Sequence, residues 1–136
     1  MRALPDPQRA KPCVLVVDDD EAVGLAIAAR LGHDFRVVST TEPAQAVAIA
    51  VREDADVVLC DVNMPGMQGD EVAYAMSLDA ATATLPLIYL TALFGAEDAD
   101  QLDGQFGDYP AVSKDASTAE LRAAVEQALG LPSQDD

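Results

Sequence analysis

Short runs of consecutive apolar residues alternate along the chain with segments whose apolar residues recur at helical spacing. Three runs are apolar throughout, which is typical of strands covered on both faces of a parallel sheet. These runs are CVLVV (13–17), VVLC (57–60) and LIYL (87–90). FRVVS (35–39) mixes apolar with polar residues and suits a strand at the sheet edge, and AVS (111–113) predicts a short last strand.

Apolar residues three or four positions apart predict helices between these strands. The predicted stripes are Val23, Ile27 and Leu31, then Val47, Ala50 and Val51, then Val72, Ala75 and Met76, and finally Leu121, Val125 and Ala128. The last helix has clear ends, because Ser117 and Glu120 match a capping box and Gly130 follows the stripe. Between 96 and 110, glycines and aspartates dilute the pattern, so we expect one or two helical turns followed by a loop.

Five strands that alternate with five helices predict the α/β fold class. Right-handed crossovers wind such a repeat into an open, doubly wound, five-stranded parallel sheet with helices on both faces. A length of 136 residues corresponds to one domain. We expect that domain to cover residues 13–130, with a flexible N-terminal arm at 1–12 and a flexible acidic tail at 131–136.

The charge and composition exclude several classes of protein. Eight basic residues against 24 acidic ones give a net charge of −16, which would repel a nucleic-acid backbone. The first twelve residues carry charge and proline where a signal peptide needs an apolar core, and no apolar run could span a bilayer. We therefore expect a cytoplasmic protein that binds neither nucleic acid nor membrane.

Cys13 and Cys60 lie inside apolar runs without CxxC spacing, which predicts core residues.

Reactive side chains follow the predicted strands at their carboxyl ends, where open α/β sheets form their binding crevice. The first strand is followed by three aspartates at 18–20 and the third by Asp61. The fourth strand ends at Thr91 and the fifth at Lys114. Acidic, hydroxyl and ammonium groups from distant parts of the chain are thus predicted to meet at one edge of the sheet.

Such an acidic cluster needs a cation. Like charges about 4 Å apart repel by roughly 4 kcal/mol at an effective dielectric constant near 20, and a single lysine cannot balance four carboxylates. Carboxylates, a backbone carbonyl and water are the oxygen ligands that Mg²⁺ accepts, so we predict a divalent metal site. A phosphoryl group would complete the site, with Asp61 as its nucleophile, because Asp61 stands alone on the central strand and a Pro-Gly turn follows it.

The motifs at these strand ends resemble the receiver domain of bacterial response regulators. They are VLVVDDD (14–20), LCDVNMPGMQGDE (59–71), LTA (90–92) and SKDAS (113–117), and the resemblance covers about residues 13–130. Four motifs in this order, each at a strand's carboxyl end, make a specific signal. The resemblance implies a flavodoxin-like (βα)5 fold with strand order 2-1-3-4-5.

The resemblance also implies roles for individual residues. Asp18 and Asp19 match the acidic pair, with Asp19 binding Mg²⁺ directly and Asp18 through water. Asp61 matches the phosphoacceptor and metal ligand, and the backbone carbonyl of Asn63 matches the third protein ligand of the metal.

Thr91 and Lys114 match the residues that contact the phosphoryl group. The implied donor is a phosphohistidine on a histidine kinase or a histidine phosphotransfer protein. The aspartyl phosphate would later be hydrolysed by water, which makes the protein a self-phosphorylating phosphoacceptor with autodephosphorylation rather than a turnover enzyme. We expect a stand-alone receiver that relays phosphoryl groups or docks on a downstream protein target.

Two positions depart from the family pattern. The usual aromatic switch position is Ala111, so Tyr109 or Phe106 would have to substitute for it. Lys114 is followed by Asp115 rather than by proline, and we expect a trans peptide there because a non-proline cis bond costs about 2.5–4 kcal/mol.

Two other functions stay open at this point. One is a phosphatase resembling the haloacid dehalogenase family, with Asp18 and Asp20 as its Asp-x-Asp pair. Against it, Ala22 stands where a small β-branched residue is expected, and the later acidic motif is reduced to residues 107–108. The other is a pseudo-receiver that binds partners without being phosphorylated, since the region of the fifth strand is irregular.

Overall fold

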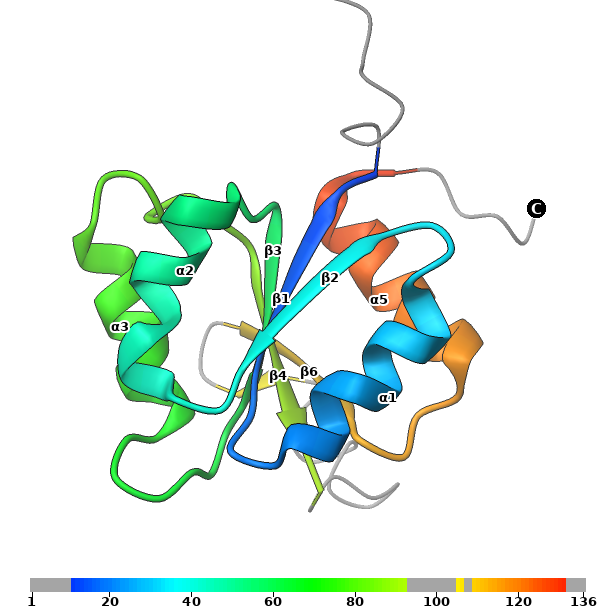
Figure 1. The fold of residues 1–136 in the computed structure, drawn as a ribbon, viewed down its shortest axis with the longest axis horizontal. Coiled ribbons are helices and arrows are strands. Elements are labelled where there is room, and N and C mark those ends of the chain that lie inside the picture. The colour runs from blue at the N-terminus through cyan, green and yellow to red at the C-terminus, as the bar shows by residue number, and fades with distance from the viewer. Residues whose placement is uncertain (1–10, 93–104, 107–108, 132–136) are drawn as a thin grey trace, which may run out of the picture.

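The computed structural model describes residues 11–92, 105–106 and 109–131 (Figure 1). Its strands are β1 (Cys13–Val17), β2 (Arg36–Thr40), β3 (Val57–Asp61), β4 (Leu87–Thr91), β5 (Gln105–Phe106) and β6 (Tyr109–Ser113). Its helices are α1 (Glu21–Leu31), α2 (Ala46–Glu53), α3 (Gly69–Leu78) and α5 (Thr118–Leu129), and a 3-10 turn at Pro43–Gln45 precedes α2. The arm predicted at 1–12 and the tail predicted at 131–136 lie almost wholly outside the described residues, as does most of the helical stretch predicted after residue 96.

Five of the strands form a parallel sheet in the order β2-β1-β3-β4-β6, which confirms the predicted order 2-1-3-4-5. The order follows from the chain reversing direction across the sheet after β2. A sixth strand, β5, pairs antiparallel with β6 at the sheet edge, Gln105 opposite Pro110 and Phe106 opposite Tyr109. The prediction of a loop up to residue 110 was wrong for these residues, because a two-residue strand is too short to carry a periodic signal.

Helices cover both faces of the sheet, with α2 and α3 on one side and α1 and α5 on the other (Figure 1). Because successive side chains of a strand point to opposite faces of the sheet, each central strand contributes side chains to two hydrophobic cores. Within β1, Leu15 and Val17 belong to the core under α2 and α3, whereas Val14 and Val16 belong to the core under α1 and α5. All five residues of β1, β3 and β4 are buried, which explains the continuous apolar runs.

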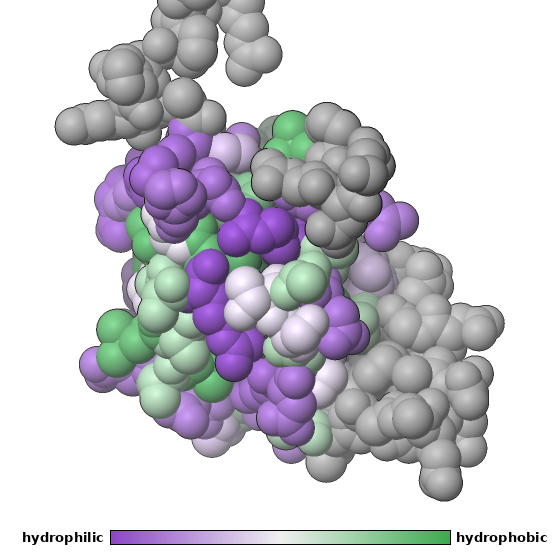
Figure 2. All heavy atoms as spheres, turned by 90° about the vertical axis from the view of Figure 1, so that its right-hand side faces the viewer, coloured by the Kyte–Doolittle hydropathy of each residue, from purple (hydrophilic) through white to green (hydrophobic). Residues whose placement is uncertain are grey.

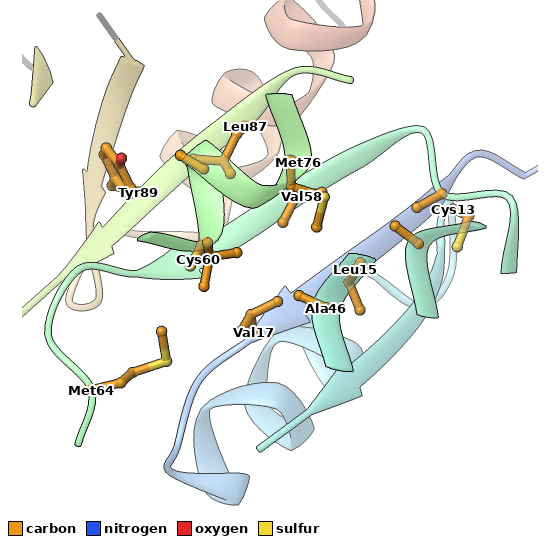
Figure 3. Close-up of a cluster of buried hydrophobic side chains, with 14 residues drawn as sticks. Cys13, Leu15, Val17, Ala46, Val58, Cys60, Met64, Met76, Leu87 and Tyr89 are labelled. Atoms are coloured by element: carbon orange, nitrogen blue, oxygen red, sulfur yellow. The ribbon is translucent and has the colours of Figure 1, made fainter. Parts of the chain in front are cut away.

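On the α1 side, Ile27 and Leu31 are buried beneath an outer surface where hydrophilic and weakly apolar residues mix (Figure 2). On the α2 side, Figure 3 shows Ala46 of α2 and Met76 of α3 lying over side chains of β1, β3 and β4. The predicted stripe of α2 was wrong at Val51, which is 49% exposed, since Ala46 and Ala50 face the sheet instead.

Among the described residues, none of the helices is both long and apolar enough to cross a bilayer.

The ends of α5 follow the predicted capping chemistry. Ser117 accepts a hydrogen bond from the Glu120 N–H at 3.1 Å, and the Glu120 carboxylate accepts one from the Ser117 N–H at 3.2 Å. Gly130 ends the helix in the left-handed conformation, at φ 72°, which glycine adopts without a steric penalty. These local interactions fix where α5 begins, four residues after Lys114.

Gly69, the first residue of α3, lies against the backbone that leaves β3. A Cβ at this position would lie 2.6 Å from the carbonyl oxygen of Asp61 and 2.9 Å from Cα of Val62. We therefore predict that Gly69→Ala lowers the free energy of unfolding by about 1–3 kcal/mol, as overpacking does in other cores. Urea denaturation measures this loss.

Tyr74→Ala on the same helix is the matched control. Tyr74 is 65% exposed, so its replacement should change the unfolding free energy by no more than about 0.5 kcal/mol. Equal stability of Gly69→Ala and wild type would show that the α3–β3 contact is looser than described.

Both cysteines are buried free thiols, Cys13 in β1 and Cys60 in β3, as predicted. Burial raises the pKa of Cys60 to about 12, with smaller contributions from the charges of Asp61 and Asp18, and burial also raises the pKa of Cys13. Since the thiolate is the reactive species, neither thiol should react with an aromatic disulfide reagent in the folded protein at pH 8. Both should react promptly in guanidinium chloride, and fast reaction without denaturant would contradict the packing of these strands.

Candidate functional site

The carboxyl ends of β1 and β3 bring three carboxylates together. Val17 and Cys60 are paired across the two strands, so the residues that follow them, Asp18 and Asp61, are neighbours at the sheet edge. Carboxylate oxygens of Asp18, Asp19 and Asp61 all lie within 4.8 Å of one another. Asp18 and Asp61 are buried, at 2% and 4% exposure, while Asp19 is exposed to solvent. The predicted convergence is therefore present for three of the four acidic residues.

Backbone hydrogen bonds fix the orientation of the two buried carboxylates. Oδ1 of Asp18 accepts from the N–H of Asp20 at 2.8 Å. Oδ1 of Asp61 accepts from the N–H of Asn63 at 3.2 Å. Both are aspartate turns in which the side chain bonds two residues ahead, so each strand end bends immediately after its carboxylate. The second bond also holds Asn63, the predicted carbonyl ligand, next to Asp61.

Lys114 joins the two buried carboxylates from the end of β6. Its ammonium nitrogen lies 2.8 Å from Oδ2 of Asp18 and 3.3 Å from Oδ2 of Asp61. The backbone N–H of Lys114 donates to the carbonyl of Thr91 at 3.0 Å, which ties the end of β6 to the end of β4. Thr91 itself is 1% exposed at the same edge. The structure thus places Thr91 and Lys114 with the acidic residues, as predicted from their positions after the strands.

The charges at this edge are only partly balanced. Burial raises the pKa of Asp61 and the charge of Asp18 adds to this, although the Asn63 N–H and Lys114 act in the opposite direction. Burial alone would lower the pKa of Lys114, but its hydrogen bond and charge interaction with Asp18, and then those with Asp61, raise the pKa overall. These surroundings therefore destabilise the negative form of Asp61 and stabilise the positive form of Lys114.

The residues present fit a divalent cation. Oδ2 of Asp18 is fully buried, and its only partner among the described residues is the ammonium of Lys114, with which it forms an ion pair. One ammonium, paired with Asp18 and Asp61, cannot neutralise a cluster of three carboxylates, so negative charge is left uncompensated. An all-oxygen set that is partly exposed through Asp19 suits Mg²⁺, which keeps several of its waters. Asp18, Asp19 and Asp61 are the side chains that could hold it.

Asp20 has a different role from its two neighbours. Its carboxylate accepts a hydrogen bond from the Ala22 N–H at 3.0 Å and forms the N-cap of α1. It is exposed and does not belong to the carboxylate cluster of the described residues. In the Asp18–Asp20 pair that a dehalogenase-like phosphatase would use, the second carboxylate therefore serves as a helix cap.

Strand β6 differs from the common receiver pattern at the position that the sequence indicated. Tyr109 packs edge to face against Tyr89 of β4, with ring centroids 5.7 Å apart, and Ala111 lies in the middle of the strand. The side chain of Phe106 lies outside the described part of the chain. No cis peptide occurs in that part, so the bond from Lys114 to Asp115 is trans, as predicted.

Comparisons with known proteins identify the family of this chain. The family model for the response regulator receiver domain matches residues 14–126. The chain is 40% identical over 86 residues to the response regulator PleD of Caulobacter vibrioides, covering 62% of this chain and 19% of PleD. It is 34% identical over 79 residues to the protein PilH of Pseudomonas aeruginosa, covering 57% of this chain and 65% of PilH. The chain thus spans less than two thirds of the length of these relatives.

Solved structures show the same fold. The chemotaxis protein CheY4 of Vibrio cholerae superimposes with a TM-score of 0.74 at 24% identity, covering 88% of this chain and 100% of CheY4. A response regulator from Desulfuromonas acetoxidans gives a TM-score of 0.71 at 24% identity, covering 88% and 97%. With the family match spanning most of the domain, the chain belongs to the response regulator receiver domain family of two-component signalling.

Proposed function

We propose that this receiver takes a phosphoryl group onto Asp61 from a phosphohistidine donor, with Mg²⁺ bound by Asp18, Asp19, Asp61 and the carbonyl of Asn63. The observation that carries the proposal is the set of three carboxylates within 4.8 Å of one another, two of which, Asp18 and Asp61, are paired with the ammonium of Lys114. Receiver domains typically bind Mg²⁺ at such an acidic pocket. The ion, when bound, would offset the charge of the incoming phosphoryl oxygens.

The chemistry proposed for Asp61 is an attack by one carboxylate oxygen on phosphorus. The bond between phosphorus and the donor's imidazole nitrogen breaks, and that nitrogen keeps the electron pair and takes up a proton. Water later attacks the aspartyl phosphate, which releases inorganic phosphate and restores the carboxylate. Burial of Asp61 supports this role, because a desolvated carboxylate is a stronger nucleophile than a hydrated one.

Lys114 and Thr91 are proposed to hold the phosphoryl oxygens after transfer. Lys114 already lies 3.3 Å from Asp61, so its ammonium needs little movement to pair with a phosphoryl group on that residue. The hydrogen bond from the Lys114 N–H to the Thr91 carbonyl joins the two strand ends that would respond. A shift of these ends would change the surface around the turn that follows β6, and so the binding of a partner.

Receiver domains in general interact with histidine kinases and downstream effectors. For this chain we propose a histidine kinase or a histidine phosphotransfer protein as donor and a protein as target. The net charge of −16 argues against direct contact with nucleic acid.

The direct test is incubation with Mg²⁺ and acetyl phosphate, followed by intact mass measurement. Wild type should gain one acid-labile phosphoryl group, and Asp61→Asn should gain none. Asp20→Asn is the matched control, because Asp20 caps α1 outside the cluster and its variant should still be phosphorylated.

Mapping the modified peptide separates the alternatives. A phosphoryl group on Asp61 supports the proposal, whereas one on Asp18 would indicate phosphatase-like chemistry. No adduct with either acetyl phosphate or a phosphohistidine protein would identify a pseudo-receiver.

A second prediction concerns the repulsion within the carboxylate cluster. Asp19→Asn removes one of three neighbouring charges and should raise the unfolding free energy in EDTA by about 1 kcal/mol, the Coulomb energy of one exposed pair in water. Saturating Mg²⁺ at about 100 times its dissociation constant should stabilise wild type by about 2.7 kcal/mol and the variant by clearly less. Thermal unfolding with and without Mg²⁺ measures both effects, and equal stabilisation of the two proteins would rule out Asp19 as a ligand.

A further inference from the structure

The turn that carries Lys114 is bonded to a side chain from the far end of α1. Nη1 of Arg30 donates to the backbone carbonyl of Ala116 at 3.2 Å, across 86 positions of sequence. Arg30 stands in the last turn of α1 and is exposed. Nothing in the local sequence pattern singles this arginine out, since its partner is a backbone atom of a distant turn.

Inside the turn, Lys114 lies between short-range hydrogen bonds. The Ala116 N–H donates to the Ser113 carbonyl at 3.0 Å, and the Asp115 N–H donates to Oγ of Ser113 at 3.0 Å. These bonds make the turn a compact unit whose last residue is Ala116. Holding the Ala116 carbonyl therefore fixes the whole unit relative to α1, including the backbone of Lys114.

Packing beneath the turn is incomplete. A cavity of about 160 Å³ separates it from α1, on the side of the molecule seen in Figure 2. Ala22, Val23, Ala26 and Ile27 of α1 line the cavity, and Arg30, Ser113, Lys114 and Ala116 also border it. Short alanine side chains leave this gap, so close packing does not hold the turn against α1. Arg30 bridges the cavity with a long side chain and a donor that stays charged.

We propose that Arg30 is a positioning residue that holds the turn at residues 113–116 so that the Lys114 ammonium stays between Asp18 and Asp61. The ammonium lies within 3.3 Å of both carboxylates, and a small displacement of the turn would break one of these pairs. An effect of Arg30 on phosphoryl transfer rests on the proposed function. Its effect on the position of Lys114 is independent of that function.

The first experiment needs no phosphorylation. The chain contains two lysines, Lys11 and Lys114, so limiting acetylation followed by peptide mass spectrometry follows both amines in one sample. Lys114 is 22% exposed and paired with two carboxylates, and wild type should acetylate it more slowly than Lys11, which is exposed and makes only a long hydrogen bond of 3.4 Å to the Gly32 carbonyl. In Arg30→Met the rate at Lys114 should rise about two- to tenfold, the range expected for one lost hydrogen bond, while the rate at Lys11 is unchanged.

Arg52→Met is the matched control, because Arg52 is an exposed arginine on α2 whose ionic partner is its neighbour Glu53. It should leave the rate at Lys114 as in wild type, and Arg30→Lys should fall between wild type and Arg30→Met. An unchanged rate at Lys114 in Arg30→Met would overturn the proposal. So would an equal rise at both lysines, which indicates general loosening of the fold.

The second experiment is a double-mutant cycle on the rate of Asp61 phosphorylation by acetyl phosphate at saturating Mg²⁺. Arg30→Met should slow the reaction about two- to tenfold when Lys114 is present and should have no further effect in Lys114→Ala. Equal slowing in both backgrounds would mean that Arg30 does not act through Lys114. Should wild type not be phosphorylated at all, the proposed function fails, and the acetylation rates alone decide whether Arg30 holds the turn.

Discussion

Mutual repulsion of the carboxylates at one edge of the sheet is the constraint on which this receiver depends. The register between β1 and β3 places these carboxylates together, because Asp18 and Asp61 follow the paired residues Val17 and Cys60 and must be neighbours. Two of the carboxylates are buried, where water screens them least. The cores on both faces of the sheet supply the stability that offsets this repulsion. The folded site therefore keeps an excess of negative charge, which favours the binding of a cation.

The same constraint explains why Lys114 belongs to the site although it comes from a separate strand. Its ammonium offsets part of the negative charge, and its position depends on the turn that follows β6. That turn is tied to β4 through the Thr91 carbonyl and to α1 through Arg30. Movement of Lys114 is therefore linked to β4 and α1. A change of charge at the site could in this way alter the position of elements at the outer surface. Receiver domains in general interact with histidine kinases and downstream effectors.

Most of the fold could be predicted because its signals are local. Strands buried on both faces produce continuous apolar runs, as in VVLC before Asp61, and the acids that follow them mark the binding edge. The capping box of Ser117 and Glu120 fixed the start of α5 for the same reason. Val51 was placed wrongly, since helical spacing alone does not decide which of two adjacent faces of α2 meets the sheet. The β5–β6 hairpin was missed because its pairing involves only two residues on one side, and the bond from Arg30 to Ala116 was missed because neither end carries a motif.

A crystal structure grown with Mn²⁺, an oxygen-seeking substitute for Mg²⁺, would show whether the three carboxylates hold a metal ion. We predict one strong anomalous peak bound by Asp18, Asp19 and Asp61, with the Asn63 carbonyl as a further ligand and Lys114 beside Asp61. No peak at this edge, or Mn²⁺ bound elsewhere while the three carboxylates stay as close as they are here, would contradict it.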